Sequence, residues 1–471
     1  MTAQTSPGPS IAPNVGDALA LFRTLASPGL VQDLLVASHR RFYDRVFGPL
    51  VVLWGFVYQR LNSNHTLDAA LAHLSSGAVD GLGDPKRPPI SKRIRSESTA
   101  AYSKGRGRLP LSVLQGVGRH LARKADAFLG EDACWHGHQV ALLDGSTFAV
   151  YPNGDLVEHY GQAENQHGAC YWVVVRMLAA FGLKTGALWD IAEGPQTQSE
   201  QALAKEVLAR LPENTIVIGD GNFGVYSVVQ SARHYHSLTL LRLTPSRAQA
   251  LAKAQPAPNQ DRLILWAPSK HDQTDPQMSS LPIPGRLISG QLVRDGFRPI
   301  DLYLFTTLVD ARTYPVDELV ECYCQRWQVE LDLLYVKSLV GLEVLSAKSV
   351  EMVRKELWAV LIAYNLVRAA MVLGAKPTSR SPLTLSFTKC YHRLQAALGQ
   401  AGPSAGSDAP GGLPQPLLSR LAKCVLQRRI PFRAEPRAVR RRRRPYPPLK
   451  GTRQQARESA RRQALAMPTK C

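Results

Sequence analysis

Four residues with chemically active side chains stand at regular spacing in one apolar-periodic segment. Tyr323, Arg326, Glu330 and Lys337 lie in PVDELVECYCQRWQVELDLLYVKSL at offsets of 0, 3, 7 and 14 residues. In one continuous α-helix, at about 100° per residue, these offsets fall within an arc of about 60°. One helix face would then present an acid between two bases and a phenol. Ordinary i, i+4 pairing of Arg326 with Glu330 on a solvated helix is the alternative interpretation.

Two aspartates follow short apolar runs elsewhere in the chain. Asp144 ends VALL, Asp220 ends TIVIG, and a glycine follows each. Carboxylates that converge from separate elements can hold two divalent cations for phosphodiester transfer. Either aspartate alone is equally well explained as a turn residue, since Asp-Gly is a common turn signal. Together with Glu330 they predict a catalytic site in which all three carboxylates bind Mg²⁺, with Mn²⁺ as a substitute.

The elements that must position these residues change in character along the chain. Residues 17–129 have helical spacing. Three β-rich runs follow, HQVALLDGSTFAVYP, CYWVVVRMLAAFG and ALWDIAEG, which predict a three-stranded meander. QSEQALAKEVLARL and GVYSVVQSARHYH predict helices, and TIVIGD and SLTLLRL predict strands, so helices and strands alternate there. Residues 251–299 predict an irregular β insertion, PIDLYLFTTL another strand, and the segment with Glu330 a single long helix.

The charge distribution predicts a polyanionic partner. The chain has 57 Lys and Arg against 37 Asp and Glu, a net charge of +20. Residues 433–464 carry 12 basic and 2 acidic residues, and residues 75–124 carry 11 basic and 3 acidic ones. Such clusters attract nucleic acid, whereas a charge that serves only solubility would be spread along the chain. We therefore expect double-stranded DNA as the partner.

Cysteine usage and hydropathy favour a protein of a reducing cytoplasm. The seven cysteines include no C-x-x-C pair, so neither a disulfide framework nor a zinc knuckle is indicated. The longest apolar stretch, residues 357–375, contains Asn365 and Arg368, which are costly in a bilayer. We interpret it as a buried helix and expect no membrane association. Residues 401–416, AGPSAGSDAPGGLPQP, have the composition of a flexible linker.

Three fragments resemble a known family. LLDGSTF, IGDGNFG and YCQRWQVELDLLYVK are similar to the three signature regions of bacterial insertion-sequence transposases of the DDE class, in the insertion-sequence-four group named for Y-R-E-K. STAAYSKGRGRLPLSVL, ELWAVLIAYNLVR and PRAVRRRRRPYPPLKGTR extend the resemblance, which runs from about residue 40 to 453. One departure is visible: many relatives have Arg directly after the second Asp, where this chain has Gly221 and Asn222.

The resemblance implies an α/β fold with an RNase H-like catalytic core interrupted by a β insertion. Its expected divisions are a helical N-terminal DNA-binding domain (1–130), the catalytic domain (131–250 and 300–376), the β insertion (251–299), and a C-terminal helical segment, linker and basic tail (377–471). Asp144 would lie on the first strand, Asp220 after the fourth and Glu330 on a late helix. Carried over by motif position, Tyr323, Arg326 and Lys337 would bind phosphates of DNA beside the cut.

The implied function is that of a DNA transposase, an endonuclease that cleaves at the ends of its element and transfers the strand into target DNA by cut-and-paste. A homodimer on paired ends and nucleoid association would follow. Two alternatives stay open: an RNase H-like metal-dependent nuclease without strand transfer, and a domesticated DNA-binding regulator.

Four further residues have a structural explanation. Glu200 recurs near its position in the family, but with Thr197 it forms a capping-box pattern, which favours a structural role. His159 and His167 have no metal-ligand spacing and are interpreted as loop or packing residues. Trp266 is expected in a small core rather than against an extruded base.

Overall fold

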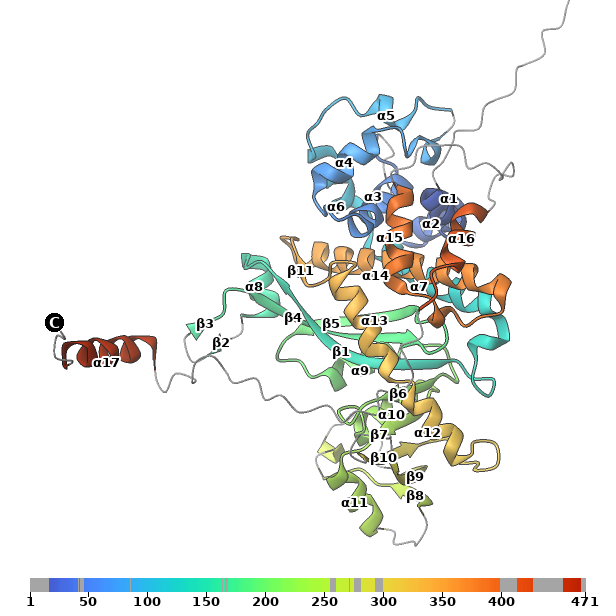
Figure 1. The fold of residues 1–471 in the computed structure, drawn as a ribbon, viewed down its shortest axis with the longest axis vertical. Coiled ribbons are helices and arrows are strands. Elements are labelled where there is room, and N and C mark those ends of the chain that lie inside the picture. The colour runs from blue at the N-terminus through green and yellow to red at the C-terminus, as the bar shows by residue number, and fades with distance from the viewer. Residues whose placement is uncertain are drawn as a thin grey trace, which may run out of the picture.

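The computed structural model describes residues 17–40, 42, 46–84, 86–162, 164–165, 168–254, 260–270, 272–274, 281–292, 300–398, 413–426 and 452–466. Within these ranges the chain is a mixed α/β protein, as predicted, with one large sheet and helices on both of its faces (Figure 1). The helices of residues 17–108 lie at the top of that view, and the strands of residues 261–306 lie near its bottom.

The order of the strands explains how distant segments meet. From one edge to the other it is β5-β4-β1-β6-β7-β10-β9-β8, and the short β11 pairs with β1. β1, β4 and β5 form the predicted antiparallel meander, and β6 and β7 run parallel to β1. β2 and β3 pair with each other in a small second sheet. The strands are β1 (Val140–Val150), β2 (Glu164–Asn165), β3 (Gly168–Ala169), β4 (Val173–Gly182), β5 (Leu188–Pro195), β6 (Ile216–Gly219), β7 (Leu238–Arg242), β8 (Asp261–Trp266), β9 (Ile283–Leu292), β10 (Ile300–Thr306) and β11 (Val344–Leu345).

Apolar side chains on both faces of the sheet produce two cores. On β1, Leu142 belongs to the larger core and Leu143 to the smaller, because successive side chains of a strand point to opposite faces. The larger core includes residues of α7 (Leu111–Leu129) and α14 (Val350–Ala375). The smaller core includes residues of α9 (Glu200–Leu208) and α10 (Tyr226–His234). The central strands are therefore covered on both sides.

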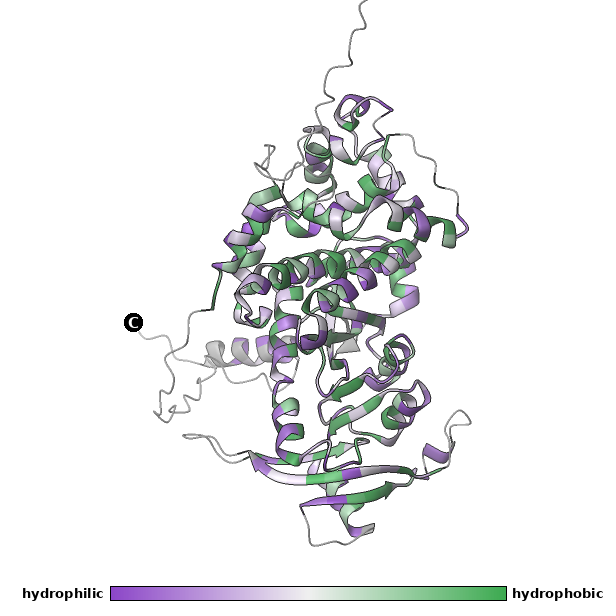
Figure 2. Ribbon diagram, turned by 90° about the vertical axis from the view of Figure 1, so that its right-hand side faces the viewer, coloured by the Kyte–Doolittle hydropathy of each residue, from purple (hydrophilic) through white to green (hydrophobic). Residues whose placement is uncertain are grey.

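Helix α14 is buried from Lys355 to its end at Ala375, which confirms the prediction for residues 357–375. Its Asn365 is fully buried and satisfied, since its amide accepts from Leu188 N and donates to the carbonyls of Leu188 and Gly118. Residues 350–378 are long and apolar enough to cross a membrane, yet the apolar window is entirely buried inside the protein. In Figure 2 the long helix across the middle of the molecule is mainly green, as expected for the core.

Helices before β1 form the predicted helical region, tied to α14 by buried charges. Glu356 of α14 accepts a 3.1 Å hydrogen bond from Arg60 and a 2.7 Å bond from Arg106, and all three side chains are buried. Removing one partner of a buried ion pair costs about 3–5 kcal/mol, so these contacts hold the helices firmly to α14. The helices of this region are α1 (Asp17–Leu25), α2 (Pro28–Ala37), α3 (Pro49–Leu61), α4 (Leu67–Ser75), α5 (Ile90–Arg93), α6 (Ala100–Arg108) and α7.

The single long helix expected around Glu330 is wrong. The segment forms two helices, α12 (Val316–Cys324) and α13 (Trp327–Ser338), which meet at Gln325 and Arg326. At the junction the bonds are of the tighter i to i−3 kind: Gln325 N donates to Cys322 O and Arg326 N to Tyr323 O. A 3₁₀ turn advances about 120° per residue, so the arc calculated for one continuous α-helix does not hold across the break. Tyr323 belongs to α12, whereas Glu330 and Lys337 belong to α13.

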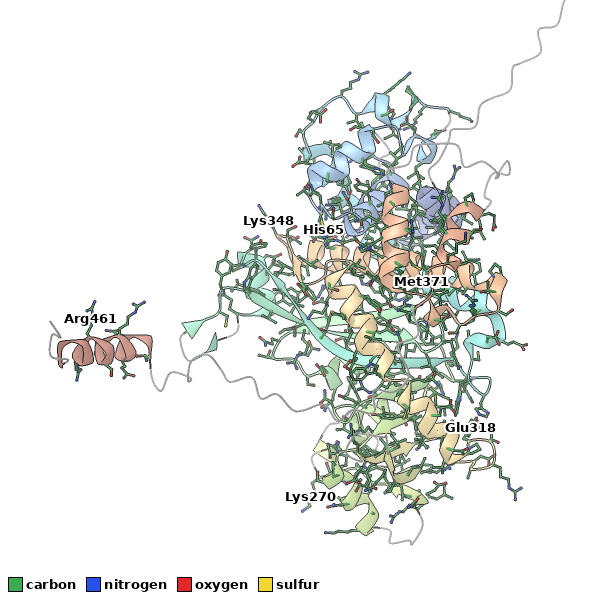
Figure 3. All side chains as sticks on the ribbon, in the orientation of Figure 1. His65, Lys270, Glu318, Lys348, Met371 and Arg461 are labelled. Carbon is green, nitrogen blue, oxygen red and sulfur yellow. The ribbon has the colours of Figure 1, made fainter. Side chains whose placement is uncertain are left out.

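Five further α-helices lie in the described residues. They are α8 (Gly154–Tyr160), α11 (Pro245–Ala254), α15 (Phe387–Leu398), α16 (Gln415–Ala422) and α17 (Arg453–Ala466). Two residues expected in the linker, Gln415 and Pro416, instead begin α16, and residues 401–412 lie outside the described ranges. Most of the basic tail also lies outside them. Its end forms α17, where Arg457, Arg461 and Arg462 are exposed; Arg461 is labelled in Figure 3.

Candidate active site

The register of two parallel strands brings Asp144 and Asp220 to the same level of the sheet. Ala141 of β1 pairs with Val217 of β6, and Leu142 with Ile218. Continuing this register by two residues sets Asp144 opposite Asp220, directly beyond the end of β6. Neighbouring strands are about 4.8 Å apart, so the two aspartates start from adjacent backbone positions. The two apolar runs thus bring their aspartates together. Asp220 directly follows β6, whereas Asp144 lies inside β1, which continues to Val150, so the expectation that both acids stand at strand ends is wrong for Asp144.

The Asp144 carboxyl is largely buried and its pKa is raised. Burial raises the pKa of the Asp144 carboxyl to about 6, and the negative charges of Asp220 and Glu200 also raise it. The guanidinium of Arg326 and the Gly145 N–H, which donates to Asp144 Oδ1 at 2.9 Å, oppose that rise. A bound cation would stabilise the ionised form of these carboxylates, because it offsets both their desolvation and their mutual repulsion.

The loop after β6 fixes the Asp220 side chain. Asn222 N donates to Asp220 Oδ1 at 2.9 Å, and Phe223 N donates to Asp220 O at 3.1 Å, so the turn closes over the aspartate. Arg247 of α11 supports this turn from outside by donating to Gly224 O at 2.7 Å. The turn interpretation and the site interpretation of Asp220 are therefore compatible.

Arg326 lies close to both Asp144 and Glu330. Its Nη2 donates to Glu330 Oε1 at 2.9 Å, and Asp144 and Glu330 both attract its charge and raise its pKa. The Arg326 side chain is 18% exposed, against 39% for Glu330. The i, i+4 pair expected as an alternative is thus present, but its arginine faces the aspartate cluster as well. Pairing on the helix and a role in the site are not exclusive.

Tyr323 lies close to the same cluster and Lys337 lies further away. The Tyr323 ring is buried, and desolvation raises the pKa of its hydroxyl, while nearby Arg326 and Arg242 lower it and Asp220 raises it. Lys337 is half-buried two turns beyond Glu330 on α13, about 10 Å along the helix axis. Its side chain makes no hydrogen bond or ion pair with the described residues.

The start of α12 is held to the sheet by a contact outside the cluster. His136 Nε2, just before β1, lies 2.5 Å from Glu318 Oε2, and Glu318 is labelled in Figure 3. At the other end, the carboxylate of Asp332 on α13 accepts from Arg368 of α14, and both side chains are buried. These two contacts anchor the α12–α13 segment on either side of Arg326.

Glu200 is close to the cluster, and the sequence interpretation missed its surroundings. A side-chain carbon on Gly145 would lie 2.2 Å from the Glu200 carboxyl carbon, so this carboxylate packs directly on the β1 backbone beside Asp144. Its Oε2 accepts from Asn222 Nδ2 at 2.6 Å. The expected capping box is wrong, because Ser199 caps α9 by accepting from Ala202 N at 3.1 Å.

Arg242 is a second residue that sequence reasoning missed. It is the last residue of β7, the strand next to β6, and its charge acts on Tyr323. The signal was available, since Arg242 ends the apolar run of its strand as Asp144 and Asp220 end theirs. Only the neighbouring strand order shows that this end faces the same site.

Trp266 and His159 both make structural contacts outside the acids of the candidate site. Trp266 is 5% exposed and its ring is 4.7 Å from that of Phe305, so the expectation of a small core is confirmed. His159 Nε2 lies 3.4 Å from Arg354 Nη2 in a contact between α8 and α14. His167 lies outside the described residues.

The carboxylates of Asp144, Asp220 and Glu330 suit a divalent cation by their chemistry, but the three are too far apart to hold one ion together. Carboxylate oxygens are the ligands that Mg²⁺ and Mn²⁺ prefer. Among the described residues, no group of three or more His, Cys, Asp or Glu side chains is close enough to hold one ion. Glu330 is held by Arg326 instead, so it would have to exchange that partner for a cation.

Comparisons with known proteins agree with one another. Residues 135–366 match the family model described as "Transposase DDE domain". Transposase InsG for insertion sequence element IS4, from Escherichia coli (strain K12), is 27% identical over 327 residues, which covers 66% of this chain and 70% of that protein. Putative transposase InsZ from the same organism is 31% identical over 127 residues, which covers 26% of this chain and 42% of that protein.

One solved structure is similar at a low level. A cryo-EM structure of a piggyBac transposase synaptic complex with hairpin DNA aligns with 88% of this chain and 87% of its own, at a TM-score of 0.41 and 10% identity. At that level the likeness says nothing about the site.

Proposed function

We infer from the match of residues 135–366 that the chain belongs to the DDE transposases of bacterial insertion sequences, and we derive its activity from that premise. The chain is a DNA transposase, an enzyme that cleaves DNA and transfers a strand. The family uses divalent metal ions and acts on DNA, and a protein of this kind works in the bacterial cytoplasm. We propose its catalytic residues and the steps of its reaction.

The observation that carries the proposal is the arrangement around Arg326. Asp144 and Asp220 stand level in the register of two neighbouring parallel strands, and Arg326, whose charge acts on Asp144, donates to Glu330 on a helix. Three carboxylates from three elements, with a guanidinium among them, form a site for a phosphate and its cations. We assign Asp144, Asp220 and Glu330 as the catalytic metal ligands, with Mg²⁺ as the ion and Mn²⁺ as a substitute.

The proposed core is RNase H-like. A three-stranded antiparallel meander followed by two strands parallel to the first, in the order β5-β4-β1-β6-β7, supports this assignment. We propose the divisions 1–130 for a helical DNA-binding domain and 131–250 with 300–376 for the catalytic domain. Residues 251–299 would be the β insertion, and residues 377–471 a C-terminal helical segment, linker and tail.

In the reaction, the chain's own residues would bind and orient phosphate. Divalent cations supply activation of the attacking oxygen and neutralisation of the leaving oxygen. Arg326 grips a phosphate oxygen through its planar fork and, on doing so, releases Glu330 toward the cation site. Tyr323 donates its hydroxyl, which its buried environment keeps protonated, and Lys337 contributes a point charge further along the DNA strand.

Two steps on DNA complete the proposal. Hydrolysis at an element end frees a 3′ hydroxyl, which then attacks a phosphodiester of target DNA in a cut-and-paste reaction. No covalent enzyme intermediate is needed. Two ends must be handled together, so a homodimer on paired ends, associated with the nucleoid, is the proposed working form.

Carboxylate variants test the assignment. Asp144→Asn, Asp220→Asn and Glu330→Gln should each abolish cleavage in Mg²⁺ while leaving DNA binding largely intact, because phosphate contacts supply most of the affinity. The substrate is labelled DNA from both flanks of the gene. Asp317→Asn, an exposed acid on α12, is the matched control and should cleave normally, and chelation of the metal should stop the wild type.

The same assay separates the rival functions. A metal-dependent nuclease without strand transfer would cut but join no end to target DNA, and a regulator would bind without cutting. Cleavage at near wild-type rate in any one carboxylate variant would remove that residue from the site.

A further inference from the structure

A cavity of about 620 Å³ opens beside α6 in the helical region that precedes the sheet. Its walls come from α5, from the loop between α5 and α6, from α6 itself and from the residues just before α3. Figure 1 shows these helices at the top of the molecule, on the far side of α14 from β6 and β7. The cavity shares no residue with the acid cluster.

Positive charge dominates the lining of this cavity. Arg93, Arg95, Lys104 and Arg108 line it, and no acidic side chain among the described residues does. Arg95, Lys104 and Arg108 are exposed and make no hydrogen bond or ion pair with described residues. Nearby Arg106, by contrast, is buried and paired with Glu356. Cations held together without a counter-charge repel one another, so a bound anion relieves a cost that the free protein carries.

The positions of the cations favour an extended anion over a small one. Lys104 and Arg108 are four residues apart on α6, so they share a face with about 5–6 Å between their Cβ atoms. Arg93 ends α5 and Arg95 lies in the loop that follows it, and the apolar side chains of Phe47 and Ile94 are part of the same lining. One phosphate ion would satisfy only part of this set. A strand with successive phosphates and apolar sugar faces between them matches all of it.

We propose that this cavity binds the sugar–phosphate backbone of DNA and is an anchoring site for the element's end. The proposal rests on the transposase function and adds to it a phosphate-binding site outside the catalytic core. Contacts to backbone phosphates fix the position and orientation of DNA without reading its sequence. The site therefore contributes affinity and placement rather than sequence choice.

Buried contacts make this site a fixed point relative to the acids. On α6, Arg106 donates to Glu356 of α14, and Lys355 of α14 donates to Gly107 O at 2.8 Å. The same helix α14 holds α13 through Arg368 and Asp332. Helix α14 thus contacts both α6, along which the DNA would bind, and α13, which carries Glu330.

The first test removes the charges of Arg95, Lys104 and Arg108, which have no partner among the described residues. The triple variant Arg95→Gln, Lys104→Gln, Arg108→Gln is compared with Arg23→Gln, Lys376→Gln, Arg380→Gln, which removes three equally exposed cations elsewhere. Anisotropy titrations of full-length protein use labelled duplex from the flanks of the gene at several salt concentrations. Each phosphate contact adds about 0.9 to the slope of log affinity against log salt, so the cavity variant should lose roughly 2–3 units. The control should lose less than about one unit.

A second test locates the DNA without removing any charge. A benzophenone amino acid is placed at Ser98, which lines the cavity, or at Ser103, which is exposed on α6 but does not line it. Irradiation with the same duplex should cross-link the Ser98 protein several-fold more. Addition of inorganic phosphate at constant ionic strength should not displace the cross-link, whereas a small-anion site would release it.

The outcomes for the cavity and for the catalytic function are distinguishable. Equal slope losses in both triple variants, equal cross-linking at both serines, or displacement by inorganic phosphate would each overturn the proposed site, even if the wild type cleaves DNA. Conversely, the slope loss could be specific to the cavity variant while the wild-type protein never cleaves DNA. That result would retain the DNA-binding site and reject the catalytic proposal.

Discussion

Replacement of Arg326 by lysine tests whether the arginine belongs to the site or merely pairs along its helix. Lysine retains the charge but loses the planar fork that reaches two partners at once. Arg326 donates to Glu330 at 2.9 Å, is 18% exposed and acts on Asp144 as well. An exposed i, i+4 pair contributes only about 0.3–0.5 kcal/mol, whereas a hydrogen bond to a charged group contributes about 1.5–3 kcal/mol.

These two magnitudes predict rates that an assay can separate. At 1.36 kcal/mol per tenfold change, loss of a site contact slows cleavage by about 10- to 100-fold, and loss of a surface pair by about twofold. The measurement is single-turnover cleavage of labelled end DNA at saturating protein, with affinity determined separately. Overall binding should change little, because one contact among many phosphates is lost.

A matched control guards against a general effect of the substitution. Arg354 also pairs with a carboxylate, Glu193 at 2.6 Å, but belongs to a contact outside the acid cluster. Arg354→Lys should leave the cleavage rate within about twofold, by the surface-pair magnitude. If Arg326→Lys also cleaved within twofold of wild type, or if its binding and cleavage fell equally, Arg326 would be reduced to a helix pair or a generic electrostatic contact.

Three further variants test the framework around the site. Asp332→Asn should lower the free energy of unfolding in urea by about 3–5 kcal/mol, since it leaves Arg368 buried without a counter-charge, and a loss below 1 kcal/mol would contradict the buried pair. Gly145→Ala should be destabilising because its new methyl group meets Glu200, and adding Glu200→Ala should restore part of the loss; additive effects would mean that the two do not touch. Truncation after Phe432, within a segment outside the described residues, should reduce the salt slope of DNA binding by roughly 3–4 units if four of the 13 Lys and Arg residues that it removes contact phosphates, and an unchanged slope would exclude the tail as a DNA contact.

Local pattern was sufficient for the elements that carry the acids. Residues before Asp144 and Asp220 are uninterrupted apolar runs, and the structure shows both runs as buried strands. The burial of residues 357–375 followed from the same kind of evidence, since apolar side chains surround two polar residues that a bilayer would reject. Such features depend on the residues of a segment and their immediate neighbours.

The break between α12 and α13 could not be predicted in this way. The residues from Val316 to Ser338 have good helical spacing throughout, and neither proline nor glycine interrupts them. The turn at Gln325 and Arg326 accompanies anchoring on both sides, by His136 before β1 and by Arg368 of α14. His136 and Arg368 are both distant in sequence from Gln325, so the helix propensities of the segment itself do not reflect these contacts.

The sequence by itself determined the chemistry available to this protein: which aspartates follow buried apolar runs, which helical segment carries Glu330, where the basic clusters lie and which family the motifs resemble. Tertiary structure alone decided how that chemistry is assembled. Parallel pairing of β6 beside β1 set Asp144 level with Asp220, docking of α13 brought Arg326 between Asp144 and Glu330, and packing of α9 laid Glu200 over Gly145. Strand register and helix docking arise from contacts between residues far apart in the chain, and the free energy of those contacts exists only once the layers have packed together.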